Sequence, residues 1–152
     1  MAYRHVQWGW TWLLYLIFSV VMVAVVVAGM GESGGDEAVW VTVVTVGFLV
    51  ALFLVVLLFS RLEVTVDSEN VMAAFGFGWP KKVVALEDVV AVREVRNTWW
   101  QGWGIRRISN GWTYNVWGLD AVELELSDGR AFRLGSDDNA QFLAAVTLLV
   151  GN

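Results

Sequence analysis

The chain has 152 residues, of which 57 % are hydrophobic, and its formal net charge at pH 7 is −5. From residue 61 onward there are nine basic and twelve acidic residues, and this balance argues against a duplex nucleic acid as partner, because such binding needs many Lys and Arg contacts. Cysteine is absent, which excludes disulfides, thiolate catalysis and cysteine-based zinc or iron–sulfur sites.

Two long apolar segments open the chain. Residues 8–30 and 38–60 contain no charged side chain. At a rise of about 1.5 Å per residue, each segment is long enough to cross a hydrocarbon core of about 30 Å. We therefore predict a membrane protein in which residues 1–60 form a transmembrane helical hairpin. The first segment is longer than the apolar core of a usual signal peptide, so we expect it to be retained.

Charges beside the two segments predict the orientation of the hairpin. The connection, residues 31–37, has three acidic residues and no basic one, whereas Arg4 and Arg61 lie at the outer ends of the two segments. Basic residues favour the cytoplasmic side. The prediction is a multi-pass protein of the inner (plasma) membrane, with both termini and residues 61–152 in the cytoplasm.

Tryptophans stand near the ends of both predicted helices, where indole rings favour the headgroup zone. We expect four of them to be interfacial anchors: Trp8, Trp10, Trp12 and Trp40. Inside the segments no ionisable side chain occurs, so proton relay or transport by a single copy has little support.

Beyond residue 61 the hydrophobic period changes to two. Leu62, Val64 and Val66 alternate with polar residues, which predicts a strand with one buried face. Similar extended segments recur at residues 71–75, 82–86, 89–96, 104–109, 112–117, 119–126 and 130–134. After Ser136, a helix cap, the apolar positions 142, 146 and 149 predict an amphipathic helix. This α+β pattern favours about seven antiparallel strands in a bent sheet or partly open barrel, closed by a C-terminal helix.

Several of these segments also carry a family resemblance. They are residues 71–76, the Trp-Trp-Gln-Gly-Trp-Gly-Ile-Arg run at 99–106, and residues 111–118, 121–126, 128–130 and 132–137. Together they resemble the bacterial pleckstrin-homology-like (PH-like) domains of small two-span membrane proteins. The resemblance implies a PH-like antiparallel β-barrel or sandwich over residues 61–152 and a tendency toward binding or assembly. Asn139 departs from it, because proline is expected at the start of the closing helix.

Residues suited to catalysis are sparse. The single histidine, His5, precedes the predicted domain, so we expect no histidine-based triad, acid–base pair or metal site within it. The carboxylate pairs at residues 87–88 and 137–138 fall at a turn and at a helix start, where they are usually solvated. We expect no enzyme activity, cofactor, metal or small-molecule substrate.

The aromatic loop region gives the strongest functional signal. Its candidate contact residues for a partner or lipid are Trp99, Trp100, Trp103, Arg106, Arg107, Trp112, Tyr114 and Trp117. Each Trp buries about 150 to 250 Å², so one small core cannot accept all of these rings and some should be exposed. Three uses remain open: a lid over the core, a protein interface, and contact with lipid headgroups.

These observations lead to a functional prediction. We expect a non-enzymatic, membrane-anchored binding or scaffold module that engages protein partners or other copies of itself. The alternative is a sensor of anionic lipid headgroups that uses the Trp and Arg side chains of the loop. An oligomeric pore is a third possibility.

Overall fold

The computed structural model describes residues 3–30, 35–101 and 103–150. The chain divides into two compact units. One is the helical hairpin, Trp10–Leu58; the other, here called the β module, combines Met1–Gly9 with Phe59–Asn152. The first nine residues therefore belong with the β module, whereas the sequence placed them with the hairpin.

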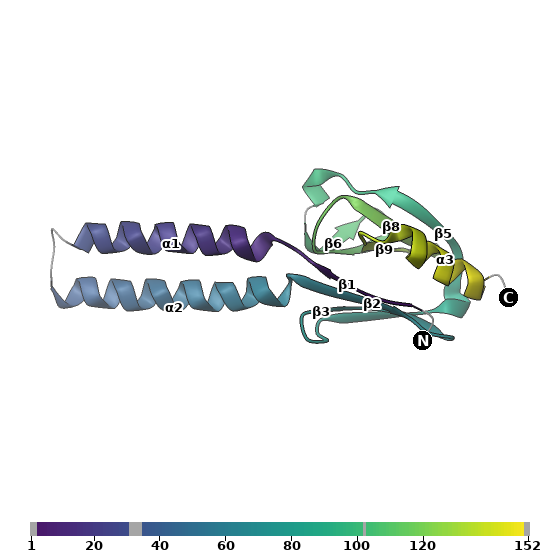
Figure 1. Ribbon diagram of the computed structural model, residues 1–152, viewed down its shortest axis with the longest axis horizontal. Helices are drawn as coiled ribbons and strands as arrows, with labels where there is room; N and C mark the ends of the chain where they lie inside the picture. The colour runs from purple at the N-terminus through teal and green to yellow at the C-terminus, as the bar shows by residue number, and fades with distance from the viewer. Residues whose placement is uncertain (1–2, 31–34, 102, 151–152) are drawn as a thin grey trace. The chain divides into compact units, whose positions relative to one another are not determined.

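In the hairpin, α1 (Thr11–Met30) and α2 (Asp36–Leu58) run side by side (Figure 1). Both are long and apolar enough to cross a membrane, which agrees with the two predicted spans. At most 6 % of either span is buried, whereas a core helix of a soluble protein is mostly buried. Residues 31–34 of the predicted connection lie outside the described residues. Asp36 and Glu37 instead begin α2, where carboxylates oppose the positive end of the helix dipole.

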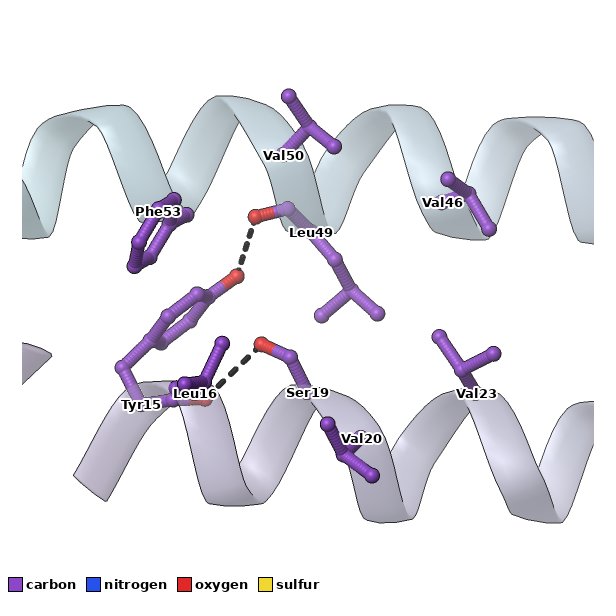
Figure 2. A pocket seen from close by; sticks show the side chains of 9 residues that line it. All are labelled: Tyr15, Leu16, Ser19, Val20, Val23, Val46, Leu49, Val50 and Phe53. Atoms are coloured by element: carbon purple, nitrogen blue, oxygen red, sulfur yellow. Dashed lines mark hydrogen bonds between the residues drawn. The ribbon is translucent and has the colours of Figure 1, made fainter. Parts of the chain in front are cut away.

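Tyr15 links the two helices. Its hydroxyl donates a hydrogen bond to the carbonyl oxygen of Leu49, and its ring stacks on Phe53 with centroids 5.8 Å apart (Figure 2). Ser19 donates to the Tyr15 carbonyl within α1, at 2.9 Å. The hydroxyl group of Tyr15 thus has a hydrogen-bond partner within the otherwise apolar contact between the two helices.

The β module contains two sheets (Figure 1). The first is antiparallel in the order β1 (Tyr3–Trp8), β2 (Arg61–Val66), β3 (Asn70–Phe75), β4 (Lys81–Ala85). The second has the order β5 (Val89–Arg96), β8 (Asp120–Leu126), β9 (Ala131–Gly135), β7 (Gly111–Asn115), β6 (Gly104–Ile108). Short 3₁₀ turns occur at η1 (Leu86–Asp88) and η2 (Trp99–Gln101), and α3 (Asn139–Val150) follows the last strand.

The number of strands differs from the prediction. The described residues form nine strands, not about seven, and the two sheets do not join into a closed barrel. The additional strand in front of the helices is β1, which pairs with β2 along its whole length, from Tyr3 opposite Val66 to Trp8 opposite Arg61. The first helix consequently begins at Thr11 and not near residue 8. Because the partner of β1 follows both helices in the chain, no local pattern reveals the pairing.

The expectation of an all-antiparallel arrangement is also wrong at one place. β7 and β9 pair in parallel. Strands β7, β8 and β9 alternate in direction, and β9 pairs with β8 on one edge and β7 on the other, so its second pairing is necessarily parallel. The approach is close at Gly111, where a Cβ atom would lie 1.7 Å from the Ala131 carbonyl oxygen.

Both sheets and α3 contribute to one hydrophobic core. Phe75 from the first sheet, Leu124 and Leu134 from the second, and Phe142 and Val146 from α3 are all fully buried. The predicted buried face of β2, Leu62, Val64 and Val66, is confirmed, although Thr65 on its other face is buried as well. The predicted apolar stripe of the closing helix is also confirmed, with Leu149 partly buried against the core. Each large side chain buried in this way stabilises the module by about 1.5 to 3 kcal/mol.

Candidate functional site

The chain passes between the β module and the hairpin at one end of the module, here called the exit end. Gly9 follows β1 and Ser60 precedes β2, and the Gly9 N–H donates a hydrogen bond to the Ser60 carbonyl at 2.7 Å. A Cβ atom on Gly9 would lie 2.5 Å from the carbonyl oxygen of Val116. The connection between β7 and β8 is therefore packed directly against the point of exit.

Loops distant in sequence lie at the exit end, on opposite sides of it (Figure 1). The β3–β4 turn, residues 76–80, is tied to β2 by a hydrogen bond from the Gly76 N–H to the Arg61 carbonyl, at 2.9 Å. The β5–β6 loop is tied to the β7–β8 connection by a bond from the Asn97 N–H to the Leu119 carbonyl, at 2.7 Å. β5 and β6 are the two edges of their sheet, so this loop must cross the sheet from one side to the other.

These loops expose a set of aromatic side chains at the exit end. The set, here called the aromatic collar, comprises Trp8, Phe77, Trp79, Trp99, Trp100 and Trp103. Their exposed fractions range from 42 % for Trp103 to 97 % for Phe77. The ring centroids of Trp99 and Trp100 lie 4.0 Å apart. Trp103 stacks on Trp117, with ring centroids 5.0 Å apart and an interplanar angle of 10°. Large apolar groups gathered on a surface in this way mark a site of contact with another apolar phase or partner.

The structure separates the residues that the sequence grouped as one loop. Trp99, Trp100 and Trp103 lie in the collar, and Trp117 is partly buried beneath Trp103. Gly102, within the loop motif, lies outside the described residues. Tyr114 is a core residue, 9 % exposed, with its ring 5.4 Å from Phe75 and 5.1 Å from Phe132. It is therefore not a surface contact, and its burial raises the pKa of its hydroxyl.

The remaining predicted contact residues lie on β6 and β7. Arg107 lies opposite Trp112 in the neighbouring strand, and both side chains are exposed. This pair lies one position closer to the β6–β7 turn than Arg106 does. The Arg106 Nε atom lies 3.5 Å from the Trp103 carbonyl oxygen, so this arginine reaches back toward the collar. Trp112 and Arg107 do not join the collar.

Two collar residues, Phe77 and Trp79, were not predicted as site residues. The sequence indicated only a bend at residues 76–80, which is confirmed by the positive φ angles of Gly76 and Gly78. A signal was present, because the turn Gly-Phe-Gly-Trp-Pro contains no polar side chain, whereas turns usually carry Asn, Asp or Ser.

The predicted membrane anchors fall on both units. Trp10 and Trp40 are exposed and Trp12 is half-buried, all within the hairpin. Trp8 is the last residue of β1 and not part of the first helix. It belongs to the β module and to the collar.

His5 lies inside the module, contrary to the prediction. It is a residue of β1, and its Nε2 atom lies 2.5 Å from Oδ1 of Asp137, just before α3, while its ring stacks on Tyr3. The premise that His5 lies ahead of the module is therefore wrong, and His5 with Asp137 forms a histidine–carboxylate pair within it. The neighbouring Tyr3 hydroxyl lies 3.5 Å from Asp138, and burial together with that carboxylate raises its pKa to about 12.

Glu123 of β8 is a buried carboxylate, only 1 % exposed. It accepts hydrogen bonds from Arg93 and Arg133, which lie opposite it on β5 and β9. Burial disfavours the ionised form of Glu123, but the two arginines outweigh that effect and lower its pKa. Glu123 and the two arginines therefore link β5, β8 and β9 through side-chain hydrogen bonds, here called the buried clamp.

An apolar groove of about 330 Å³ lies between α1 and α2, lined by residues such as Tyr15, Leu49 and Phe53 (Figure 2). Among the described residues, no group of three or more His, Asp and Glu side chains is placed to hold a metal ion.

Comparisons of the chain with protein-family models, with curated proteins and with solved structures found no match. The PH-like resemblance therefore stays a prediction, and the parallel pairing of β7 with β9 departs from the antiparallel arrangement that it implies.

Proposed function

We propose that this chain is a two-span membrane protein whose β module works at the bilayer surface by contact and not by catalysis, with its exit end turned toward the membrane. The observation that carries the proposal is the position of the aromatic collar: six exposed rings surround the end from which the chain passes directly into two apolar helices.

The short connections support this orientation. Trp10 follows Gly9 without a linker, and Phe59 and Ser60 alone separate α2 from β2. A module attached so closely to two membrane spans has its exit end held near the headgroup region. Indole rings are stabilised in that region, because the ring contacts hydrocarbon while its N–H group remains hydrated. The phenyl ring of Phe77 adds apolar surface that hydrocarbon can cover.

The pairing of β1 with β2 adds an argument about sidedness. If both helices cross the bilayer, the two paired strands hold the ends of the hairpin on one side of it. Arg61, Lys81 and Lys82 then flank the spans on that side, which is the cytoplasmic side by the positive-inside rule. Retention of the first helix follows as well, since cleavage after it would remove β1, an edge strand of the module.

A second candidate function uses the same surface. The close, tilted contact between Trp99 and Trp100, with both side chains about 70 % exposed, also suits the centre of a protein interface. In that case the module is a scaffold that binds another protein or a second copy of itself.

A labelling experiment distinguishes the two candidates. Because the chain has no cysteine, a single introduced cysteine gives one labelled position. Phe77→Cys places an environment-sensitive NBD fluorophore in the collar, and Glu87→Cys, in η1 at the other end of β4, is the matched control. Each labelled protein is reconstituted at one copy per zwitterionic lipid nanodisc.

If the exit end contacts the bilayer, the label at position 77 should emit at shorter wavelength and be quenched by brominated lipid. The label at position 87 should be quenched by iodide in the aqueous phase. Aqueous behaviour at both positions would overturn the proposal. If the label at position 77 becomes shielded only in discs with two copies, the surface is a protein interface and the second candidate holds.

A further inference from the structure

We infer that the exit end of the β module recognises anionic lipid headgroups, through Lys81, Lys82 and Arg106. This inference rests on the proposed function, since it names the class of lipid that the same surface prefers.

Most basic side chains of the module are already neutralised. Six arginines form ion pairs with carboxylates of the module: Arg4, Arg61, Arg93, Arg96, Arg130 and Arg133. Within residues 3–30, 35–101 and 103–150, the Lys and Arg side chains that form no such pair are Lys81, Lys82, Arg106 and Arg107. These four cations are all exposed and are available to an external anion.

Three of the four unpaired cations lie beside the aromatic collar. Lys81 and Lys82 follow the β3–β4 turn that carries Phe77 and Trp79. Arg106 reaches back toward the collar through its contact with the Trp103 carbonyl. Cationic groups next to exposed aromatic rings match the chemistry of the headgroup zone, where phosphates lie just above the acyl chains.

Carboxylates near the exit end do not cancel these charges. Glu63 is held between Arg4 and Arg61, at 2.7 Å and 2.6 Å, and the Arg4 hydrogen bond is the main cause of its lowered pKa. Asp120 lies 3.6 Å from Arg96. Asp137 and Asp138, which follow β9, contact His5 and Tyr3. These four carboxylates therefore have internal partners, whereas within the described part of the chain Lys81, Lys82 and Arg106 form no ion pair.

The opposite end of the module, here called the distal end, carries the reverse charge. Its turns are joined by hydrogen bonds from the Leu86 N–H to the Glu69 carbonyl and from the Ser127 N–H to the Asp88 carbonyl. These turns hold the carboxylates of Asp67, Glu69, Glu87, Asp88 and Asp128, with Arg130 beside Asp128. An anionic surface attracts the exit end and repels the distal end, so the charge distribution favours the same orientation as the collar.

A lipid surface fits this arrangement better than an acidic protein does. The exit end is tied to the hairpin by very short connections, so lipid headgroups are the anions held permanently within reach of it. Attraction to an anionic leaflet falls off within about 10 Å at 0.1 M salt, so it acts only on basic residues held this close to the headgroups.

The test compares lipid association of the full chain and two charge-matched variants in mixed bilayers of phosphatidylcholine and phosphatidylglycerol. Spin-labelled forms of the two lipids report the relative association constant by electron paramagnetic resonance. One variant is Lys81→Gln with Lys82→Gln; the control is Arg107→Gln with Arg130→Gln, which removes the same charge beside the β6–β7 and β8–β9 turns. A further single variant, Arg106→Gln, tests the third residue, and near-UV circular dichroism confirms that each variant is folded.

We expect the natural chain to prefer phosphatidylglycerol, and to lose that preference as salt rises from about 0.1 M to about 1 M. The lysine variant should reduce the preference about two- to fivefold, with a smaller loss for Arg106→Gln and no change for the control. Absence of a preference in the natural chain, or an equal loss in the lysine and control variants, would overturn the inference.

The two proposals fail in different ways. A lipid-embedded label at position 77 in pure phosphatidylcholine, together with no preference for phosphatidylglycerol, would contradict the inference and leave the proposed function standing. An aqueous label at that position would contradict both.

Discussion

The helical hairpin and the β module use the same apolar residue types in opposite ways. In the hairpin, residues such as Val44 and Phe48 lie with about two thirds of their surface exposed, whereas Val116 and Phe75 of the module are fully buried. The module provides its own apolar surroundings, while the hairpin depends on hydrocarbon around it. The two regions should therefore respond differently to the same kind of mutation.

The largest effect is expected for Gly111→Ala in the module. The new Cβ would lie 1.7 Å from the backbone oxygen of Ala131, so β7 and β9 would have to separate. We expect a loss of about 4 kcal/mol or more in the free energy of unfolding. Urea unfolding in detergent, followed by near-UV circular dichroism, measures it.

Gly47→Ala in α2 is the matched control, because no atom lies within 4 Å of the added Cβ. It should change stability little, and both variants should still insert into membranes. A tolerated Gly111→Ala substitution would contradict the parallel pairing of β7 with β9.

A somewhat smaller effect is expected for Glu123→Gln. The substitution leaves Arg133 partly buried without a carboxylate, and removing one partner of a buried pair costs about 3 kcal/mol. Asp128→Asn removes the exposed pair with Arg130 and should cost much less, because solvent screens that pair. Equal losses measured by urea unfolding would show that Glu123 is not a buried clamp.

The same carboxylate predicts how stability depends on pH. Arg133 and Arg93 outweigh burial and lower the pKa of Glu123 below its ordinary value of 4.5, and Arg4 and Arg61 lower that of Glu63. Unfolded chains then bind more protons than folded ones in acid, so this stability is complete above pH 4.5 and is lost as pH falls through the lowered values. Thermal unfolding of the natural chain should show this acid loss, and a Glu123→Gln variant with an unchanged acid slope would exclude Glu123 as a contributor.

The smallest effect is expected in the hairpin, for Tyr15→Phe. The substitution removes the hydrogen bond to the Leu49 carbonyl but keeps the ring against Phe53. Interhelical hydrogen bonds in membranes contribute about 0.6 kcal/mol on average. Unfolding in sodium dodecyl sulfate measures the change, with Ser19→Ala, whose bond stays within α1, as control. A loss as large as that of Glu123→Gln would contradict the contrast between the two regions.

Local patterns predicted the features that depend on neighbouring residues. The period of two around Leu62, Val64 and Val66 gave β2 its buried face, and uninterrupted apolar runs gave α1 and α2. Pairing between distant segments was not accessible in this way. β1 meets a partner beyond both helices, and β9 lies between β7 and β8, so neither arrangement leaves a local signature.

The candidate site also combines a feature that local sequence predicts with features that depend on distant segments. The Trp-rich loop at residues 99–103 was identified from composition, because one small core cannot accept so many rings. Its union with Phe77 and Trp79 depends on the position of the β3–β4 turn in space, and the core location of Tyr114 depends on which face of β7 meets the other sheet. The burial of Glu123 likewise has no local signal, since it is produced by arginines on two neighbouring strands.

The most direct test of the central claim is the depth of the two ends of the module relative to the bilayer. Single cysteines at positions 77, 79 and 99 of the collar and at 67, 87 and 128 of the distal end carry nitroxide labels in the full chain. Their collision rates with oxygen, which concentrates in lipid, and with a water-soluble nickel complex give depth. The account predicts that all three collar positions lie at the headgroup level and all three distal positions in water; equal depths at the two ends, or the reverse order, would contradict it.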